Sequence, residues 1–353
     1  PILAVSGMFQ AFQWPAYTAA TTLLVSKENY GRAAGMVQLA EAVGQVIAPA
    51  VAGAILVLSG LEMVILIDVI TFFVAIATLI TVRFPPTPET AAGVEGRGRL
   101  LAEARFGWDY IRTKRGLMGM LTWAAVINLL FGGLGVLIFP LILAFASEAE
   151  MGVAFSIAGI GMVAGSLVMS VWGGPKRKIN GLYIGGVAVG VTLGLAGLRP
   201  SIVLVTIAAA VTFFVLPIAN GSSQAIWQAK VEPDIQGKVF AVRRLIAQIA
   251  GPVAIIASGP LADNVFEPLL AEGGALAGTV GRVVGVGPGR GIGFLFVVLG
   301  ILAVLATLAL MADPHVRNVE DELPDVTPAD LAESDVMPDP AAVHEAATNP
   351  AEA

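Results

Sequence analysis

The stretch VSKENYGRAAG, residues 25–35, separates two long apolar runs and holds most of the charge in the first sixty residues. A similar stretch, VEPDIQGKVFA, occurs much later, at residues 231–241. Aligned on their glycines, the two stretches match at an offset of 206 residues in four pairs: Val25 with Val231, Glu28 with Asp234, Gly31 with Gly237 and Arg32 with Lys238. Because each stretch separates two apolar runs, the pair predicts that an arrangement of helices is repeated along the chain. The alternative is that charged turns between helices resemble one another by chance.

The composition places the chain in a membrane. Of its 353 residues, 56% are hydrophobic and only 13% are charged, and 41 are glycine. A soluble domain usually carries about 25% charged residues, whereas membrane helices tolerate glycine and use it for packing. The composition therefore predicts repeated membrane spans. The chain has no cysteine, which excludes disulfides and thiolate metal sites, and no metal site is expected.

Nine stretches are apolar and long enough to cross a bilayer, which takes roughly 20 residues. Each should be a helix, because backbone polar groups in lipid must be satisfied within the segment. Runs such as ILAVLATLALM, residues 301–311, lack the alternation of a barrel strand. The expected spans are about 2–25, 36–59, 63–83, 117–145, 152–172, 180–198, 200–223, 242–262 and 291–312.

Lysine and arginine gather on one side of these spans. If the loop at 26–35 is inside, then the alternate segments 84–116, 173–179 and 224–244 and the C-terminal tail are inside too. Together with Arg83, at the inner end of the third span, they hold 17 of the 20 basic residues. The positive-inside rule then predicts that residue 1 is outside and that the C-terminus is cytoplasmic.

Two segments outside the spans have their own character. Residues 84–116 open with FPPTPE and close with the amphipathic LLAEARFGWDYIRTKRG, which predicts a cytoplasmic linker along the membrane surface. Residues 313–353 hold 11 of the 26 acidic residues and are expected to form a disordered acidic tail. The expected organisation is 1–83, the remainder of an N-terminal bundle; 84–116, the linker; 117–312, a C-terminal six-helix bundle; and 313–353, the tail.

The offset of 206 residues pairs the first three spans with the last three and leaves the middle three without partners. Two similar halves of six helices would explain this pattern. The missing partners would then precede residue 1, so a lost N-terminal fragment is expected.

Three stretches carry a family resemblance: QWPAYTAATTLLVSKENYGRAAGMVQ (13–38), GQVIAPAVAGAIL (44–56) and WGGPKRKINGL (172–182). They resemble, in order, a fourth helix with its following loop, an antiporter signature in helix five, and a degraded Gly/Asp/Arg-rich loop. The chain thus resembles the major facilitator superfamily, and more closely its macrolide-efflux-like branch of drug:proton antiporters. The resemblance implies an all-α membrane protein with the major facilitator fold, in which helices four to twelve, nine of an expected twelve, are present.

The antiporter signature is matched only in part. Gly44, Pro49 and Gly53 agree with it, whereas Ala48 and Ala52 stand where glycines are usual. The resemblance implies that this segment seals the outer face of an exporter. Ordinary close packing of small residues is the alternative.

Proton coupling needs a group in the membrane that can change its charge. Both histidines lie in the tail, so the candidates within the spans are Asp68 and Glu41. Burial of a carboxylate in a helix is costly, which makes it a functional candidate, and burial raises its affinity for a proton. Asp68 is favoured because apolar residues surround it, although a hydrogen-bonded interfacial acid is the alternative. Glu41 is a proton carrier, or a latch to Arg32 or to the pair Arg243 and Arg244, or a solvated acid.

Polar and aromatic side chains within the spans are candidates for a substrate cavity. Gln10, Trp14 and Tyr17 share one helix face with Gln13 on its flank. The full set is Gln10, Gln13, Trp14, Tyr17, Asn128, Asn220 and Gln224. Hydrogen bonding between helices is the alternative for each.

The repeated turns are candidates for gates at the inner face. Glu28, Arg32, Asp234 and Lys238 could hold the two halves together when the inner gate closes. Plain solvated loops are the alternative.

These observations favour a secondary active transporter, specifically a proton-coupled exporter of small amphipathic or lipophilic compounds that works by alternating access. A facilitator-type importer or uniporter on the same fold, and a non-transporting membrane scaffold or remnant, remain open. The chain has no Gly-x-x-x-x-Gly-Lys-Ser/Thr, His-Glu-x-x-His or Gly-x-Ser-x-Gly motif, so neither an ATPase nor another enzyme is expected. The expected partners are the lipid bilayer of the plasma membrane, crossed many times, and a small-molecule substrate. No cofactor beyond the proton gradient, no nucleic acid and no ATPase subunit is expected.

Overall fold

The computed structural model describes residues 16–82 and 100–326. The described part is helical throughout, with residues 16–24 forming the first helix. The following elements are η1 (Lys27–Asn29), α2 (Tyr30–Thr81), α4 (Leu100–Thr113), α5 (Arg115–Gly132), α6 (Leu134–Leu143), α7 (Glu148–Trp172), α8 (Lys178–Leu198), α9 (Ile202–Lys230), α10 (Gln236–Leu261), the π-helical turn η2 (Ala262–Phe266), α11 (Glu267–Leu270), α12 (Gly281–Val284), α13 (Arg290–Ala312), α14 (Pro314–Arg317) and α15 (Val319–Glu322).

Seven helical segments of the described chain are long and apolar enough to cross a membrane. Six of them coincide with the six spans expected between residues 117 and 312, α5 and α6 together forming one of them. The seventh, Val51–Thr81, includes the expected span 63–83 and the end of the span 36–59. Most of the first expected span, 2–25, lies outside the described residues.

Helix α2 consists of two arms that meet at Gly60. This glycine has a φ angle of 79°, a left-handed conformation that glycine adopts without strain. The break confirms the boundary expected between residues 59 and 63. Pro49 lies within the first arm, where the backbone stays helical.

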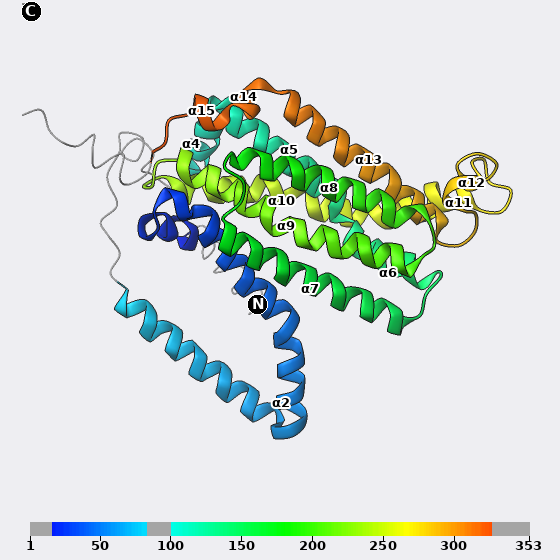
Figure 1. The fold of residues 1–353 in the computed structure, drawn as a ribbon, viewed down its shortest axis with the longest axis horizontal. Coiled ribbons are helices and arrows are strands. Elements are labelled where there is room, and N and C mark those ends of the chain that lie inside the picture. The colour runs from blue at the N-terminus through cyan, green and yellow to red at the C-terminus, as the bar shows by residue number, and fades with distance from the viewer. Residues whose placement is uncertain (1–15, 83–99, 327–353) are drawn as a thin grey trace, which may run out of the picture.

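Helices α5 to α10 and α13 form a bundle of long helices that lie side by side (Figure 1). Small residues allow the closest contacts, because a helix without side chains at the crossing can approach its neighbour's backbone. A Cβ atom at Gly300 on α13 would lie 2.5 Å from the carbonyl oxygen of Gly190 on α8. One at Gly165 on α7 would lie 2.0 Å from the carbonyl oxygen of Phe214 on α9.

The first arm of α2 packs against this bundle near its start and then leaves it. Gly31 and Gly35 face the end of α7, where a Cβ atom would lie 2.1 Å from the carbonyl oxygen of Gly173 and 2.4 Å from the backbone nitrogen of Ser170, respectively. Farther along, no residue of the most apolar stretch within Val51–Thr81 is buried in the described structure. The second arm runs apart from the bundle (Figure 1).

Charged loops gather at one end of the bundle, which we call the basic end. It carries Lys27, Arg177, Lys230 and Lys238, together with α4, α14 and α15. Elements α11 and α12 lie at the opposite end (Figure 1).

The start of the C-terminal tail is ordered, which corrects the disorder expected for all of residues 313–353. Residues 313–326 form α14 and α15 and pack on the basic end, with Val316 and Val319 fully buried. Acidic side chains in this segment bind basic side chains and a helix N-terminus: Asp325 contacts Lys27 and Lys230, Asp321 pairs with Arg177, and Glu320 accepts hydrogen bonds from the backbone nitrogens of Lys178 and Ile179. The buried valines and these partners offset the ordering entropy, which composition alone did not predict.

The amphipathic helix expected at the end of the linker is α4. Ile111 of α4 is fully buried in a cluster with Trp227 and Phe240. The apolar face of α4 therefore packs on the bundle. The hydroxyl of Tyr110 donates a hydrogen bond to Glu232, and burial, followed by the negative charge of Glu232, raises the pKa of this tyrosine. The tyrosine therefore stays protonated as a hydrogen-bond donor. Residues 83–99 of the linker lie outside the described residues.

Candidate functional site

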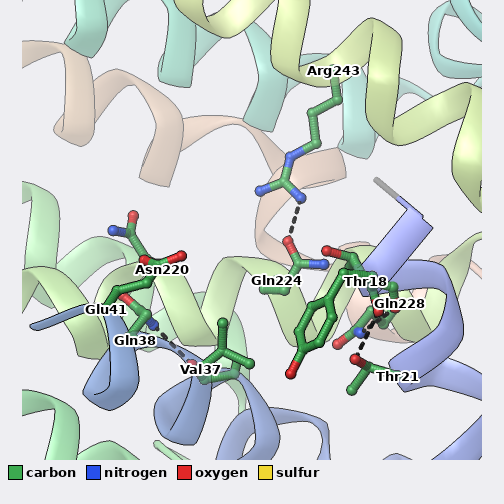
Figure 2. A pocket seen from close by; sticks show the side chains of 11 residues that line it. Thr18, Thr21, Val37, Gln38, Glu41, Asn220, Gln224, Gln228 and Arg243 are labelled. Atoms are coloured by element: carbon green, nitrogen blue, oxygen red, sulfur yellow. Dashed lines mark hydrogen bonds between the residues drawn. The ribbon is translucent and has the colours of Figure 1, made fainter. Parts of the chain in front are cut away.

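A cavity of about 220 Å³ lies where the N-terminal helices meet α9 and α10 (Figure 2). Its walls come from four elements that are far apart in sequence. Residues 16–24 supply Tyr17, Thr18 and Thr21; α2 supplies Ala34, Val37, Gln38 and Glu41; α9 supplies Asn220, Gln224 and Gln228; and α10 supplies Arg243.

A second cavity, of about 480 Å³, adjoins the first and shares Glu41, Asn220 and Arg243 with it. It extends between α5, α8 and α10, where its walls include Trp123, Asn128, Gly186, Ser223, Arg244 and Gln248. The two cavities share walls, and a few polar side chains stand among apolar ones in their lining, as in sites that hold small molecules.

Arg243 is held in place by neutral groups. Its Nη1 donates to Gln224 Oε1 at 2.9 Å and its Nη2 donates to Ser223 Oγ at 3.2 Å. The guanidinium carbon also lies 4.8 Å from the ring centroid of Trp227, a distance at which the cation is attracted to the aromatic face. No carboxylate of the described residues lies within 4.0 Å of this guanidinium.

Glu41 lies on another wall of the same cavity, beside Asn220 and Gln38 (Figure 2). Gln38 Nε2 donates to the carbonyl oxygen of Pro217 at 3.0 Å, which ties α2 to α9 next to this acid. Within the described part of the chain, Glu41 forms no ion pair with Arg32, Arg243 or Arg244. The latch considered for Glu41 is therefore not formed in this conformation.

Asp68 lies away from both cavities. It is exposed on the second arm of α2, where its backbone carbonyl accepts a hydrogen bond from Thr71 Oγ1 at 2.9 Å, and neither cavity includes it. Of the two acids proposed as proton carriers, only Glu41 reaches the polar region.

Four of the residues expected to line a cavity do so. Tyr17, Asn220 and Gln224 line the first cavity, and Asn128 and Asn220 line the second. Asn128 Nδ2 also donates to the carbonyl oxygen of Ala124 at 2.8 Å. The other three expected residues, Gln10, Gln13 and Trp14, lie outside the described residues.

Sequence reasoning missed several residues of the site. Gln38 lies three positions before Glu41, and Gln228 lies four positions after Gln224, so helical spacing could have found both. Arg243 was assigned to an inner loop because it is basic, although α10 begins at Gln236. No pattern in the sequence signalled that its side chain lines a cavity.

The repeated turns have different partners in the two halves. Arg32 Nε donates to the carbonyl oxygen of Val171 at the end of α7 (3.2 Å), and Nη1 donates to Asn29 Oδ1 (3.0 Å). Lys238 pairs with Glu103 of α4 at 3.7 Å. Arg32 thus joins an N-terminal turn to the C-terminal bundle, while Lys238 pairs with the linker helix.

Hydrogen bonds join the N-terminal helix to the C-terminal bundle at the basic end. Thr22 Oγ1 donates to Gln236 Oε1 at 2.7 Å, and Gln228 Nε2 donates to the carbonyl oxygen of Thr18 at 3.3 Å. Both bonds are buried, so the two parts of the molecule are in direct contact there.

The two glycines of the antiporter-like stretch are not sites of close helix packing in the described structure. A Cβ atom at Gly44 or Gly53 would meet nothing within 4 Å. The tightest approach of α2 to the bundle takes place at Gly31 and Gly35 instead, about two and a half to six turns earlier.

Comparisons with known proteins agree with this arrangement. The chain is 25% identical over 269 residues to Macrolide efflux protein A of Streptococcus pyogenes, covering 75% of this chain and 66% of that protein. It is 24% identical over 259 residues to Macrolide efflux protein A of Enterococcus faecalis, covering 72% of this chain and 79% of that protein. The chain thus spans about two thirds of the length of the streptococcal relative.

Among solved structures, the fold is similar to that of the major facilitator superfamily proton:xylose symporter XylE bound to 6-bromo-6-deoxy-D-glucose. The TM-score is 0.54 at 15% sequence identity, over 92% of this chain and 70% of that chain. The family model described as Major Facilitator Superfamily matches residues 2–255. The chain therefore belongs to the Major Facilitator Superfamily of multi-pass membrane transporters.

Proposed function

We propose that this protein is a proton-coupled exporter of small amphipathic compounds that works by alternating access, without covalent chemistry on its substrate. The observation that carries the proposal is the position of Glu41, a titratable acid on the wall of a polar cavity between α2 and the C-terminal bundle. In such a cavity an acid can hold either a proton or a cationic group of the substrate. Competition between the two would couple outward transport to proton entry.

The present conformation fits one state of such a cycle. The N-terminal helix and the C-terminal bundle are joined at the basic end through Thr22 and Gln236, whereas α2 leaves the bundle beyond its first turns. If the basic end is cytoplasmic, as the distribution of lysine and arginine predicts, this conformation is closed towards the cytoplasm. Opening would then require these hydrogen bonds to break.

The direction of transport rests on two resemblances. The stretch at 44–56 resembles an antiporter signature, and the curated relatives are macrolide efflux proteins. We therefore propose export across the plasma membrane, with a macrolide as the first compound to test.

The test uses everted membrane vesicles that contain the full chain and a radiolabelled macrolide. Uptake should rise when the vesicle interior is made acidic and should stop when a protonophore is added. Glu41→Gln should abolish most of this gradient-driven uptake, because the neutral amide cannot take up and release a proton. The same variant should retain exchange of labelled for unlabelled macrolide without a gradient, because exchange needs no net proton movement.

Asp68→Asn is the matched control, since Asp68 is as exposed as Glu41 but lines neither cavity. It should leave gradient-driven uptake unchanged. Normal uptake by Glu41→Gln would show that Glu41 is not the proton carrier. Absence of macrolide uptake by the unmodified protein, with and without a gradient, would contradict export of this class.

A further inference from the structure

Two opposite charges line the same cavity without contacting each other. Glu41 and Arg243 both border the first cavity and both border the second, and Figure 2 shows them on different walls. Their charged atoms are more than 4.0 Å apart, because no ion pair joins them in the described structure. The space between them is the cavity itself.

Arg243 is partly buried among the helices, where a charge is costly when it lacks a counter-charge, whereas Glu41 is exposed on its wall. Gln224 and Ser223 supply Arg243 with oxygen acceptors but with no negative charge. These two bonds use two of the five N–H donors of a guanidinium. The remaining donors can form the forked pair of bonds that a carboxylate accepts.

The two walls of the region also differ in charge. Arg244 lines the second cavity next to Arg243, so the α10 side of the region is positive. Glu41 has the amide side chains of Gln38 and Asn220 beside it (Figure 2). These three charged residues are the only ones that line either cavity among the described residues.

We infer that the cavity selects zwitterionic amphiphiles, with the acidic group of the substrate on Arg243 and its ammonium group at Glu41. This inference rests on the proposed function and names the substrate class that the site takes. A ligand with both charges satisfies each wall. A simple cation, which includes a macrolide with its single amine, leaves Arg243 without a counter-charge and should bind more weakly, and a simple anion leaves Glu41 without one. Ammonium and proton then compete for Glu41, as an antiport cycle requires.

The test uses norfloxacin as a probe, because it carries a carboxylate and a piperazine ammonium and can be altered one charge at a time. Its methyl ester keeps only the cation, and its N-acetyl derivative keeps only the anion. Binding of all three to the purified full chain in detergent would be measured by calorimetry. Norfloxacin should bind about 10- to 100-fold more tightly than either derivative, the range expected for one hydrogen-bonded charge pair.

Variants assign the two charges to their residues. Arg243→Gln should abolish the preference for norfloxacin over the methyl ester while keeping the preference over the N-acetyl derivative. Glu41→Gln should do the reverse. Arg282→Gln is the control, because Arg282 is exposed on α12 at the opposite end of the bundle. This variant should keep both preferences.

Equal binding of the three compounds, or no binding of any, would overturn the inference. A retained preference for norfloxacin over the methyl ester in Arg243→Gln would also overturn it, since the acidic group would then not bind at Arg243. Each of these outcomes leaves the proposed function standing if macrolide uptake in vesicles depends on the gradient. Absence of that uptake would count against the proposed function itself.

Discussion

Glycines in the first arm of α2 differ in what surrounds them, although the sequence presents them alike. At Gly35 a Cβ atom would lie 2.4 Å from the backbone nitrogen of Ser170 and 2.6 Å from the carbonyl carbon of Met169. Backbone cannot move aside as a flexible side chain can. At Gly44 a Cβ atom would meet nothing within 4 Å.

Gly35→Ala should therefore destabilise the protein by about 1–3 kcal/mol, the cost of overpacking a tight contact. Gly44→Ala should be neutral or stabilise it by up to about 1 kcal/mol, because alanine favours the helix. The midpoints of thermal unfolding of the two purified variants in detergent provide the comparison. Equal midpoints would mean that α2 does not approach α7 closely at Gly35.

At the scale of elements, the segment of α14 and α15 is held to the basic end by Asp325. This carboxylate contacts Lys27 of the N-terminal turn and lies 3.1 Å from Lys230 Nζ at the end of α9. Lys230 also donates to the carbonyl oxygens of Glu320 (2.6 Å) and Leu323. One acid thus connects both parts of the molecule to the tail.

Asp325→Asn should lower the free energy of local unfolding of this segment by about 1 kcal/mol, the upper range for a partly exposed ion pair. Deuterium uptake of residues 313–326 should then be roughly fivefold faster, since 1.4 kcal/mol corresponds to a factor of about 10. Asp321→Asn is the control, because its ion pair with Arg177 is solvent-exposed, and its uptake should match that of the unmodified protein. Equal deuterium uptake in all three proteins would show that Asp325 does not hold the segment to the basic end.

The same contact predicts a dependence on pH. Burial raises the pKa of Asp325, but hydrogen bonds from Lys27 and Lys230 outweigh it and hold the pKa below its usual range. A lowered pKa means that the contact stabilises the folded segment above the ordinary aspartate pKa of about 3.9. That stability is lost as the pH falls through the still lower folded value. Deuterium uptake of residues 313–326, corrected for intrinsic exchange, should rise below about pH 4 and not between pH 5 and 7.

At the scale of the whole molecule, alternating access requires the basic end to open and close. The chain has no cysteine, so a pair of introduced cysteines can be cross-linked without reaction at other thiols of the chain. A short reagent that joins Thr22→Cys to Gln236→Cys should stop macrolide transport, because Thr22 Oγ1 and Gln236 Oε1 are 2.7 Å apart across the two parts.

The matched control joins Thr192→Cys to Thr212→Cys, whose hydroxyl oxygens are 2.6 Å apart within the C-terminal bundle on α8 and α9. That cross-link should leave transport intact, since these helices move together. Continued transport with the Thr22–Gln236 pair linked would exclude opening at the basic end as part of the cycle.

The sequence by itself determined which segments are apolar enough to span a membrane, and six of its spans agree with helices of the bundle. It also located the break of α2 near residue 60 and several polar residues of the cavity. These features depend on local composition, on the length of apolar runs and on glycine, each of which can be read within one stretch of chain.

Only the tertiary structure decided which polar residues meet. Glu41, Asn220 and Arg243 come from three helices, and Asp68, with the same local signature as Glu41, lies apart from the cavities. It also decided that an acidic, proline-containing segment folds onto a basic end. The physical reason is that lipid-facing and neighbour-facing positions of a membrane helix are equally apolar. The sequence of one helix therefore carries little information about which helix lies beside it.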